Sequence, residues 1–129
     1  MSVDVKFTPS PDLEKRLEQA AEAGILAATL AVEQQVVAIC PVGKSRPGYV
    51  GGRLRGSITH KTFKDDGKIP MKTGVAKGEG IVGTNVYYAP YVEYGTYKMA
   101  PRAFLRRGLD AIKPKFAEIY GSAFKRVLG

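Results

Sequence analysis

The sequence is poor in the residue types that build disulfides, metal centres and nucleophilic sites. It holds a single cysteine, Cys40, and a single histidine, His60. One cysteine excludes a disulfide within the chain, and these two residues provide too few ligands for a zinc site made of cysteine and histidine. Cys40 has no surrounding signature of a thiol enzyme, and it precedes Pro41 at the end of an expected helix. We therefore interpret Cys40 as a small structural hydrophobe.

Long apolar runs are missing as well. No stretch approaches the roughly 18 uncharged apolar residues that span a bilayer, and the start, Met1 to Val5, has neither the basic flank nor the cleavage site of a signal peptide. These absences favour a protein that is made in the cytoplasm and has no membrane contact. With 129 residues, of which 44% are apolar, the chain fits one domain, residues 1–129, with one packed core.

Acidic residues are scarce after Pro41. Residues 1–40 hold three basic groups against six acidic ones, whereas the remainder holds seventeen basic groups against six acidic ones. The excess behind the formal charge of +8 therefore lies beyond Pro41. Such an excess attracts polyanions, because each Lys or Arg set against a phosphate releases counterions. It also serves solubility, and charge alone does not decide between these two roles.

The first third of the chain predicts a short strand followed by a long helix. Val3, Val5 and Phe7 alternate with polar neighbours, which indicates a half-buried strand. Ser10 then precedes Pro11 as an N-cap precedes proline at the first helical position. Good helix formers continue to about Ile39 and predict a helix about 43 Å long. We expect part of so long a helix to protrude or to pack on a neighbouring molecule.

Glycine and proline divide the rest of the chain into shorter elements. The expected elements are a loop over 41–52, a helical turn over 52–55, a strand over 57–64, a polar loop over 65–74, strands over 75–77 and 80–88, and a second helix over 101–128. The last two strands would form a hairpin through Gly78 and Glu79. Pro114 must kink or divide the second helix, because proline removes a backbone donor and clashes with the preceding turn. The pattern predicts an α+β fold, a small antiparallel β-sheet packed with a long N-terminal helix and a C-terminal helix.

Two glycine motifs resemble phosphate-binding loops but lie in the wrong structural context. The segment 43–45, Gly-Lys-Ser, ends like a P-loop, yet Ala38 stands where the first glycine is required, and a helix precedes it. The segment 78–83 matches G-x-G-x-x-G but leads into a strand, so no helix N-terminus would face a phosphate there. Neither motif indicates nucleotide binding.

The remaining polar residues form no catalytic set. Asp65 and Asp66 are adjacent on a turn, where neighbouring side chains point apart, and the serines lack a G-x-S-x-G elbow. His60 has no recognisable partner, so we interpret it as a surface residue or a satisfied strand residue. We therefore expect a protein that is not an enzyme and that has no cofactor and no metal site.

Two longer segments carry the most specific patterns. The first covers 51–58, Gly-Gly-Arg-Leu-Arg-Gly-Ser-Ile, where Leu54 and Ile58 can point inward. The second covers 82–106 and is rich in tyrosine. Three of its rings recur every three residues, a spacing that would stack them along one side of a tight helical turn: Tyr88, Tyr91 and Tyr94.

Glu93 is the lone acid in this tyrosine-rich turn, and its neighbours are apolar or amphipathic. We expect its carboxylate to be at least partly desolvated, and a desolvated carboxylate needs a cation or several donors to remain ionised. An arginine can grip a carboxylate through two parallel hydrogen bonds. The hypothesis is that Arg53, Arg55 or Arg102 does so and ties the tyrosine turn to the turn after the first helix or to the start of the second helix.

Together these segments resemble a family of small neck proteins of long-tailed double-stranded-DNA phages, variously called tail-completion, head–tail joining or minor tail proteins. After an early long helix and a proline, that family has three hallmark segments, which are TG-x-L-R-x-S-I, V-G-x-x-x-x-Y-A-x-Y-V-E-x-G-T and P-x-x-F-L-R-x-A. The last two match closely over 82–106, and the first matches over 52–58 with Gly51 where threonine is usual. The loop 42–51 is longer than in typical members. The matching positions are Gly52, Leu54, Ser57, Gly83, Tyr88, Tyr91, Val92, Glu93, Gly95, Thr96, Pro101, Phe104 and Leu105.

The resemblance implies a structural virion protein that completes the tail or joins it to the head. It implies a homo-oligomeric ring, commonly a hexamer, around the DNA channel, with the head-side connector on one face and the tail terminator or tube on the other. The protein would be in the host cytoplasm during assembly and in the neck of the virion afterwards. Candidates for contact with genomic DNA or a neighbouring subunit are Lys44, Arg46, Arg53 and Arg55. The alternative is a free basic nucleic-acid-binding protein, and an enzyme ranks third.

Overall fold

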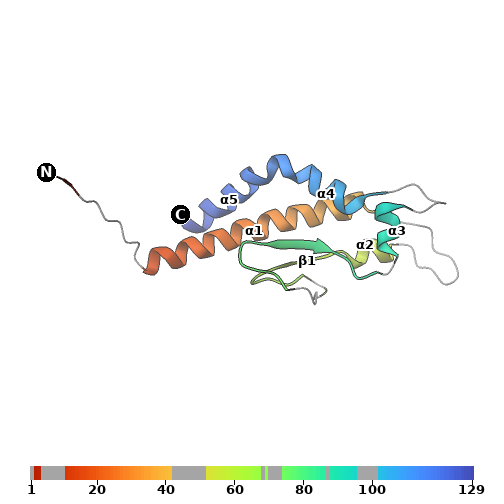
Figure 1. Ribbon diagram of the computed structural model, residues 1–129, viewed down its shortest axis with the longest axis horizontal. Coiled ribbons are helices and arrows are strands. Elements are labelled where there is room, and N and C mark those ends of the chain that lie inside the picture. The colour runs from red at the N-terminus through yellow and green to blue at the C-terminus, as the bar shows by residue number, and fades with distance from the viewer. Residues whose placement is uncertain are drawn as a thin grey trace.

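One long helix, α1 (Pro11–Ile39), runs through the computed structural model of the protein (Figure 1). The structure describes residues 2–3, 11–41, 52–67, 69, 74–86, 88–95 and 102–129. Helix α1 has the bounds that the sequence predicts, with Asp12 and Glu14 in its first turn, where the helix dipole favours negative charge. The strand expected around Val5 lies outside the described residues.

Helix α1 is long and apolar enough, by length and composition alone, to cross a membrane. The core helix of a soluble protein meets the same criterion, and here α1 packs against both strands and both C-terminal helices. Only 22% of its most apolar window is buried, however, so the other described elements leave much of its surface uncovered.

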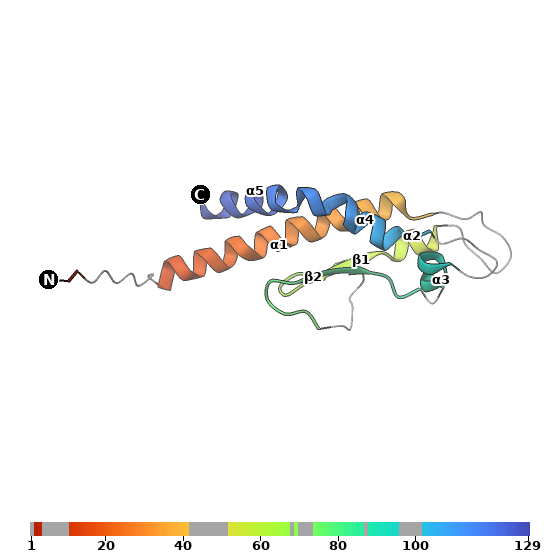
Figure 2. The ribbon, with the colours of Figure 1, turned by 45° about the horizontal axis from the view of Figure 1, so that its top comes forward.

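The second predicted helix is divided at Pro114, as expected. It consists of α4 (Phe104–Ile112), the 3-10 turn η1 (Lys113–Lys115) and α5 (Phe116–Leu128). Helix α5 lies beside α1 in both views (Figures 1 and 2). The Arg16 guanidinium, near the start of α1, donates a hydrogen bond of 2.5 Å to the carbonyl of Leu128, the last residue of α5. The start of α1 therefore lies beside the end of α5, and the two helices are antiparallel.

An aromatic row on α5 faces α1. Phe116, Tyr120 and Phe124 stand four residues apart, and the ring centroids of successive members are 6.0 Å apart. The ring of Tyr120 covers Gly24 so closely that a Cβ atom on Gly24 would lie 2.6 Å from a ring carbon. The absence of a side chain at Gly24 therefore lets the two helices approach.

Two short strands form an antiparallel sheet, β1 (Thr59–Thr62) with β2 (Gly80–Gly83), and Thr59 pairs with Gly83. The strand expected over 57–64 is confirmed with shorter bounds. The predicted hairpin is wrong, because 75–77 forms no strand and β2 pairs with β1. The segment before β2 bends instead, with the Glu79 N–H donating to the Ala76 carbonyl at 3.2 Å, and β1 offers β2 a longer partner that is already packed on α1.

The core lies near the C-terminal end of α1, where the short helices α2 (Arg53–Ser57) and α3 (Ala89–Tyr94) meet α4 (Figure 2). It consists of seven buried residues from these elements and the turns beside them: Val36, Cys40, Leu54, Ile58, Val86, Ala89 and Phe104. A small antiparallel sheet, a long N-terminal helix and a C-terminal helix confirm the predicted α+β fold.

Candidate functional site

The first hallmark segment, 52–58, is far in the sequence from the other two, which lie within 82–106, but all three come together at this core. Leu54 and Ile58 belong to the first hallmark, and Phe104 belongs to the third. All three are buried in one cluster, against which Val92 of the second hallmark is packed. The apolar hallmark residues therefore hold α2, α3 and the start of α4 against the end of α1.

Glu93 joins α3 to α4 through backbone amides. Its side chain is buried, with 7% of the residue exposed, and its carboxylate accepts hydrogen bonds from the N–H groups of Leu105 at 2.9 Å and Arg106 at 3.1 Å. The residue at the N-cap position of α4 is Ala103, which has no side-chain acceptor. The amides at the second and third helical positions are those that a capping side chain normally satisfies. Glu93 is therefore a capping residue supplied from another helix.

The predicted arginine clasp of Glu93 is wrong, although its burial and its link to the second helix are confirmed. None of the three arginines considered, all of them in the described part of the chain, forms an ion pair with Glu93. Two amides and the positive end of the α4 dipole already stabilise the carboxylate, so no cation is needed. The Arg102 N–H instead donates to the Val92 carbonyl at 2.7 Å, a second link between α3 and α4.

Arg55 stabilises the end of α1. Its guanidinium donates a hydrogen bond of 2.7 Å to the carbonyl of Cys40, just beyond the last helical residue, where a cation complements the helix dipole. The Cys40 side chain is fully buried, and burial raises the pKa of its thiol, with Arg55 acting against this shift. The structural role predicted for Cys40 fits this inert setting. Arg53 is exposed, and Lys44 and Arg46 lie outside the described residues.

Ser57 links α2 to the chain that leaves β2. Its hydroxyl donates to the Leu54 carbonyl at 2.6 Å and also lies in hydrogen-bond contact with the Thr84 hydroxyl. A hydroxyl has only one hydrogen, so Thr84 is the donor in the second contact. Thr84 follows Gly83, the last residue of β2, and accepts from the Val86 N–H at 3.2 Å. The hallmark serine therefore fixes the spacing between two hallmark segments.

Two hallmark glycines have backbone conformations that favour glycine. Gly52, at the start of α2, has φ 84°, and Gly95, directly after α3, has φ 78°. Both values lie in the left-handed region, where a Cβ atom is disfavoured. The hallmark positions Thr96 and Pro101 lie outside the described residues.

The tyrosines of the second hallmark do not form one stack. Tyr88 packs against the core, whereas Tyr94 is 79% exposed. The predicted stack assumed a 3-10 turn, but α3 is an α-helix, in which residues six apart point in different directions. The side chain of Tyr91 lies outside the described part of the structure. A large aromatic side chain is thus presented to solvent at the end of α3.

The imidazole ring of His60, on β1, lies between two carboxylates. The residue is buried, its Nδ1 contacts the Glu33 carboxylate on α1, and its Nε2 lies 2.7 Å from Oδ2 of Asp65. The prediction that His60 has no partner is wrong, while its interpretation as a satisfied strand residue is confirmed. Sequence reasoning missed Glu33 because it is 27 residues away on a different element. The nearer partner, Asp65, was set aside as a solvated loop residue.

The two contacts favour the charged imidazolium, because only that form has a hydrogen on both ring nitrogens. Burial lowers the pKa of His60, but the hydrogen bonds and charges of Asp65 and Glu33 outweigh it, so the pKa lies above its ordinary value of 6.5. Nothing in the arrangement resembles a nucleophile with its base. The described residues contain no group of three or more His, Cys, Asp or Glu that could hold a metal ion.

We expect the pKa of His60 to make stability depend on pH. A raised folded-state pKa means that the folded chain binds the proton more tightly than the unfolded chain. The contribution is complete below pH 6.5 and is lost as pH rises through the folded-state pKa. Urea unfolding across this range should show a falling free energy of unfolding for the wild type and no such fall for His60→Gln. A wild-type free energy of unfolding that does not change over this pH range would contradict the contacts of His60 with Glu33 and Asp65. His60 is the only histidine in the sequence, so no other imidazole contributes to the change.

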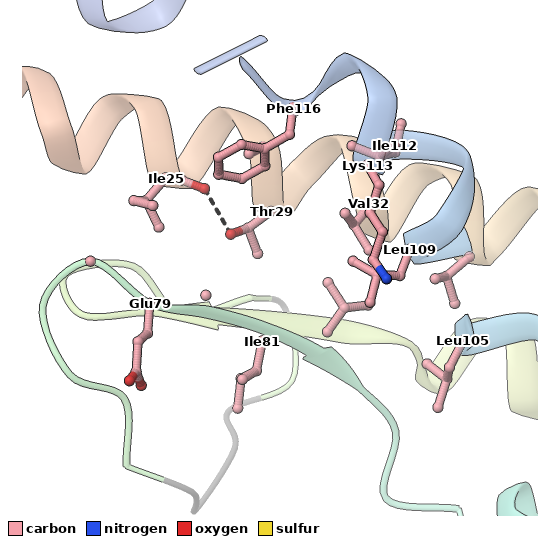
Figure 3. A pocket seen from close by; sticks show the side chains of 15 residues that line it. Ile25, Thr29, Val32, Glu79, Ile81, Leu105, Leu109, Ile112, Lys113 and Phe116 are labelled. Atoms are coloured by element: carbon pink, nitrogen blue, oxygen red, sulfur yellow. Dashed lines mark hydrogen bonds between the residues drawn. The ribbon is translucent and has the colours of Figure 1, made fainter. Parts of the chain in front are cut away.

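An apolar groove lies between β2 and the C-terminal helices, and α1 also lines it (Figure 3). Its volume is about 690 Å³. The lining includes Ile25, Thr29 and Val32 of α1, Ile81 of β2, and Leu109 and Phe116 of α4 and α5. Leu109 and Phe116 remain 45% and 44% exposed. The apolar residues at helical spacing on the second helix therefore include Leu109 and Phe116, which the described residues leave partly uncovered.

Comparison with protein-family models, with curated proteins and with solved structures finds no match to this chain.

Proposed function

We propose that this chain is a structural subunit of the head–tail junction of a long-tailed double-stranded-DNA phage, and that it acts by binding and geometry without catalysis. The observation that supports the proposal most is the convergence of the three hallmark segments on one core. Glu93 of the second hallmark caps the helix that the third hallmark begins, and Leu54 of the first packs with Phe104 of the third. These contacts give a physical reason for the three hallmark segments to occur in the same protein, because each packs on or caps another.

In this function the subunit would form a ring around the channel through which the genome leaves the head. One face would bind the head-side connector and the other the tail terminator or tube. Exposed apolar side chains on α4 and α5, such as Leu109 and Phe116, suit contacts with neighbouring subunits. The basic excess after Pro41, including the exposed Arg53, suits DNA in the channel or acidic neighbouring rings.

The test is inactivation of the gene in the phage that carries it, followed by electron microscopy of the lysate. We expect DNA-filled heads and separate tails that fail to join, and infectivity that returns when the wild-type gene is supplied on a plasmid. Normal infectious particles would contradict the proposal, and empty heads would point to an earlier role in packaging. Tight, salt-sensitive DNA binding by the isolated chain, with normal particles, would favour the free nucleic-acid-binding protein.

A further inference from the structure

The groove beside β2 has the form of a site for an extended segment. Its floor is α1 from Ile25 to Val36, a length of about 16 Å at 1.5 Å per residue. Three consecutive residues of β2, Gly80 to Val82, line one side, and no residue of β1 lines it. The groove therefore runs along the edge of β2 that faces away from β1, with α4 and α5 as the opposite wall (Figure 3).

Within the described part of the chain, β2 pairs only with β1, along its other edge. The edge at the groove therefore has no described strand beside it. An edge strand presents backbone N–H and C=O groups to which another strand can bond. A strand added there would lie about 4.8 Å from β2 and would point every second side chain towards the apolar floor. The groove is therefore complementary to a segment with apolar residues at alternate positions.

The N-terminal segment of this protein has that pattern. Val3, Val5 and Phe7 alternate with Asp4 and Lys6, and five extended residues span about 14 Å, close to the length of the groove. Val3 is 83% exposed, so the described structure gives this apolar residue no packing partner of substance. The charged groups at the groove, Glu79 and Lys113, are of opposite sign, as are Asp4 and Lys6.

A chain cannot fill its own groove with this segment. The groove begins at Ile25, about 21 Å along α1 from Pro11. Phe7 is four residues before Pro11 and can reach at most about 14 Å from it. Its own segment could therefore bring Val3 into the groove, but not all three apolar side chains.

We propose that the segment Val3–Phe7 of one copy binds as an added strand in the groove of a second copy. Val3, Val5 and Phe7 then face α1 and Leu109, while Asp4 and Lys6 face outward. The contact is head to tail, since each copy donates a segment and receives one, and such contacts close into rings or extend into fibres. This inference concerns contacts between copies and stands whether or not the protein belongs to a phage neck.

Two full-length variants separate the two halves of the contact. Val5→Asp/Phe7→Asp destroys the segment and keeps the groove, whereas Leu109→Glu places a charge in the groove and keeps the segment. The matched control is Leu30→Glu, on an equally exposed leucine of α1 that does not line the groove, at 43% exposure against 45% for Leu109. Circular dichroism checks that each variant folds.

The measurement is sedimentation of each protein alone and of the two variants mixed. We expect the wild type and Leu30→Glu to assemble, each groove or segment variant alone to remain at the chain mass of 14.0 kDa, and the mixture to form a dimer and nothing larger. Assembly of either variant alone like the wild type would overturn the proposal. So would the absence of a mixed dimer, which is the result expected if the segment folds back on its own chain or if another protein fills the groove.

A peptide provides a second readout that does not depend on assembly. A labelled peptide of residues 2–8 should bind the Val5→Asp/Phe7→Asp protein saturably in a fluorescence anisotropy titration. Adding Leu109→Glu to that protein should weaken binding at least about tenfold. A peptide with Asp4 and Val5 exchanged has the same composition but broken alternation, and it should not bind. Equal binding of both peptides, or binding that is insensitive to Leu109→Glu, contradicts the proposed strand.

Discussion

Glu93→Ala should lower the free energy of unfolding by about 2–3 kcal/mol. The substitution removes a buried carboxylate that caps α4 and leaves the amides of Leu105 and Arg106 without an acceptor. Depriving a buried donor of its partner typically costs about 1–3 kcal/mol, and loss of a cap about 0.5–2 kcal/mol. Glu93→Gln keeps one oxygen acceptor and should lose about 1 kcal/mol. Urea denaturation followed by circular dichroism measures both losses.

Glu118→Ala is the matched control, because Glu118 is also an acid near the start of a helix but is exposed. Its substitution should change the free energy of unfolding by no more than about 0.5 kcal/mol. If Glu93→Ala lowered the free energy of unfolding no more than the control does, the cap that Glu93 places on α4 would contribute little stability. The structural role given to Glu93 in the second hallmark would then be wrong. A large loss for Glu93→Ala with full retention by Glu93→Gln would show that one acceptor suffices.

Gly108→Ala should destabilise the protein by about 2 kcal/mol, although alanine is the better helix former. A Cβ atom at Gly108 would lie 2.9 Å from the backbone nitrogen of Val36 and 3.0 Å from its Cα, and backbone cannot turn aside as a flexible side chain can. Overpacking of this kind costs about 1–3 kcal/mol, while replacing glycine in a helix gains up to about 1 kcal/mol. The clash outweighs the gain because it forces α1 and α4 apart.

Gly121→Ala on α5 tests the same chemistry without the clash. No atom lies within 4 Å of the position that its Cβ would take, so the substitution should be neutral or stabilising by up to about 1 kcal/mol. The two variants should therefore move the free energy of unfolding in opposite directions in chemical denaturation. A Gly108→Ala protein as stable as Gly121→Ala would mean that α1 and α4 do not approach as closely as described.

The helices were largely predictable because their signals are local. Pro11 and the good helix formers after it define α1, and Pro114 divides the second helix at the position where its ring removes a backbone donor. The inward direction of Leu54 and Ile58 was also visible from their spacing in the sequence. These predictions depend on residues within one or two turns of each other.

The contacts between distant segments were not predictable from the sequence. The hairpin over 75–88 failed because β2 pairs with β1, about twenty residues earlier, and a local turn signal cannot reveal a longer-range partner. Glu93 was expected to pair with an arginine, because a desolvated carboxylate needs a cation or several donors. The donors are amides of α4, 12 and 13 residues later, and Ala103 at the N-cap position gives no sign that another helix caps them. Glu33 was missed as a partner of His60 for the same reason.

The exposed face of the second helix illustrates a further limit. Leu109 and Phe116 keep helical spacing with buried residues, so periodicity alone assigns them to the core. In the structure they line a groove that the described residues leave open, since the two described strands do not extend over them. Periodicity identifies a face that will be covered, but it does not say by which molecule.

The most direct test of the central claim is a cryo-electron microscopy map of the intact neck of the phage that carries this gene. The proposed function predicts a ring of copies of this chain around the channel between the head-side connector and the tail, recognisable by the paired α1 and α5 helices. A resolved neck in which every subunit belongs to another protein would contradict it.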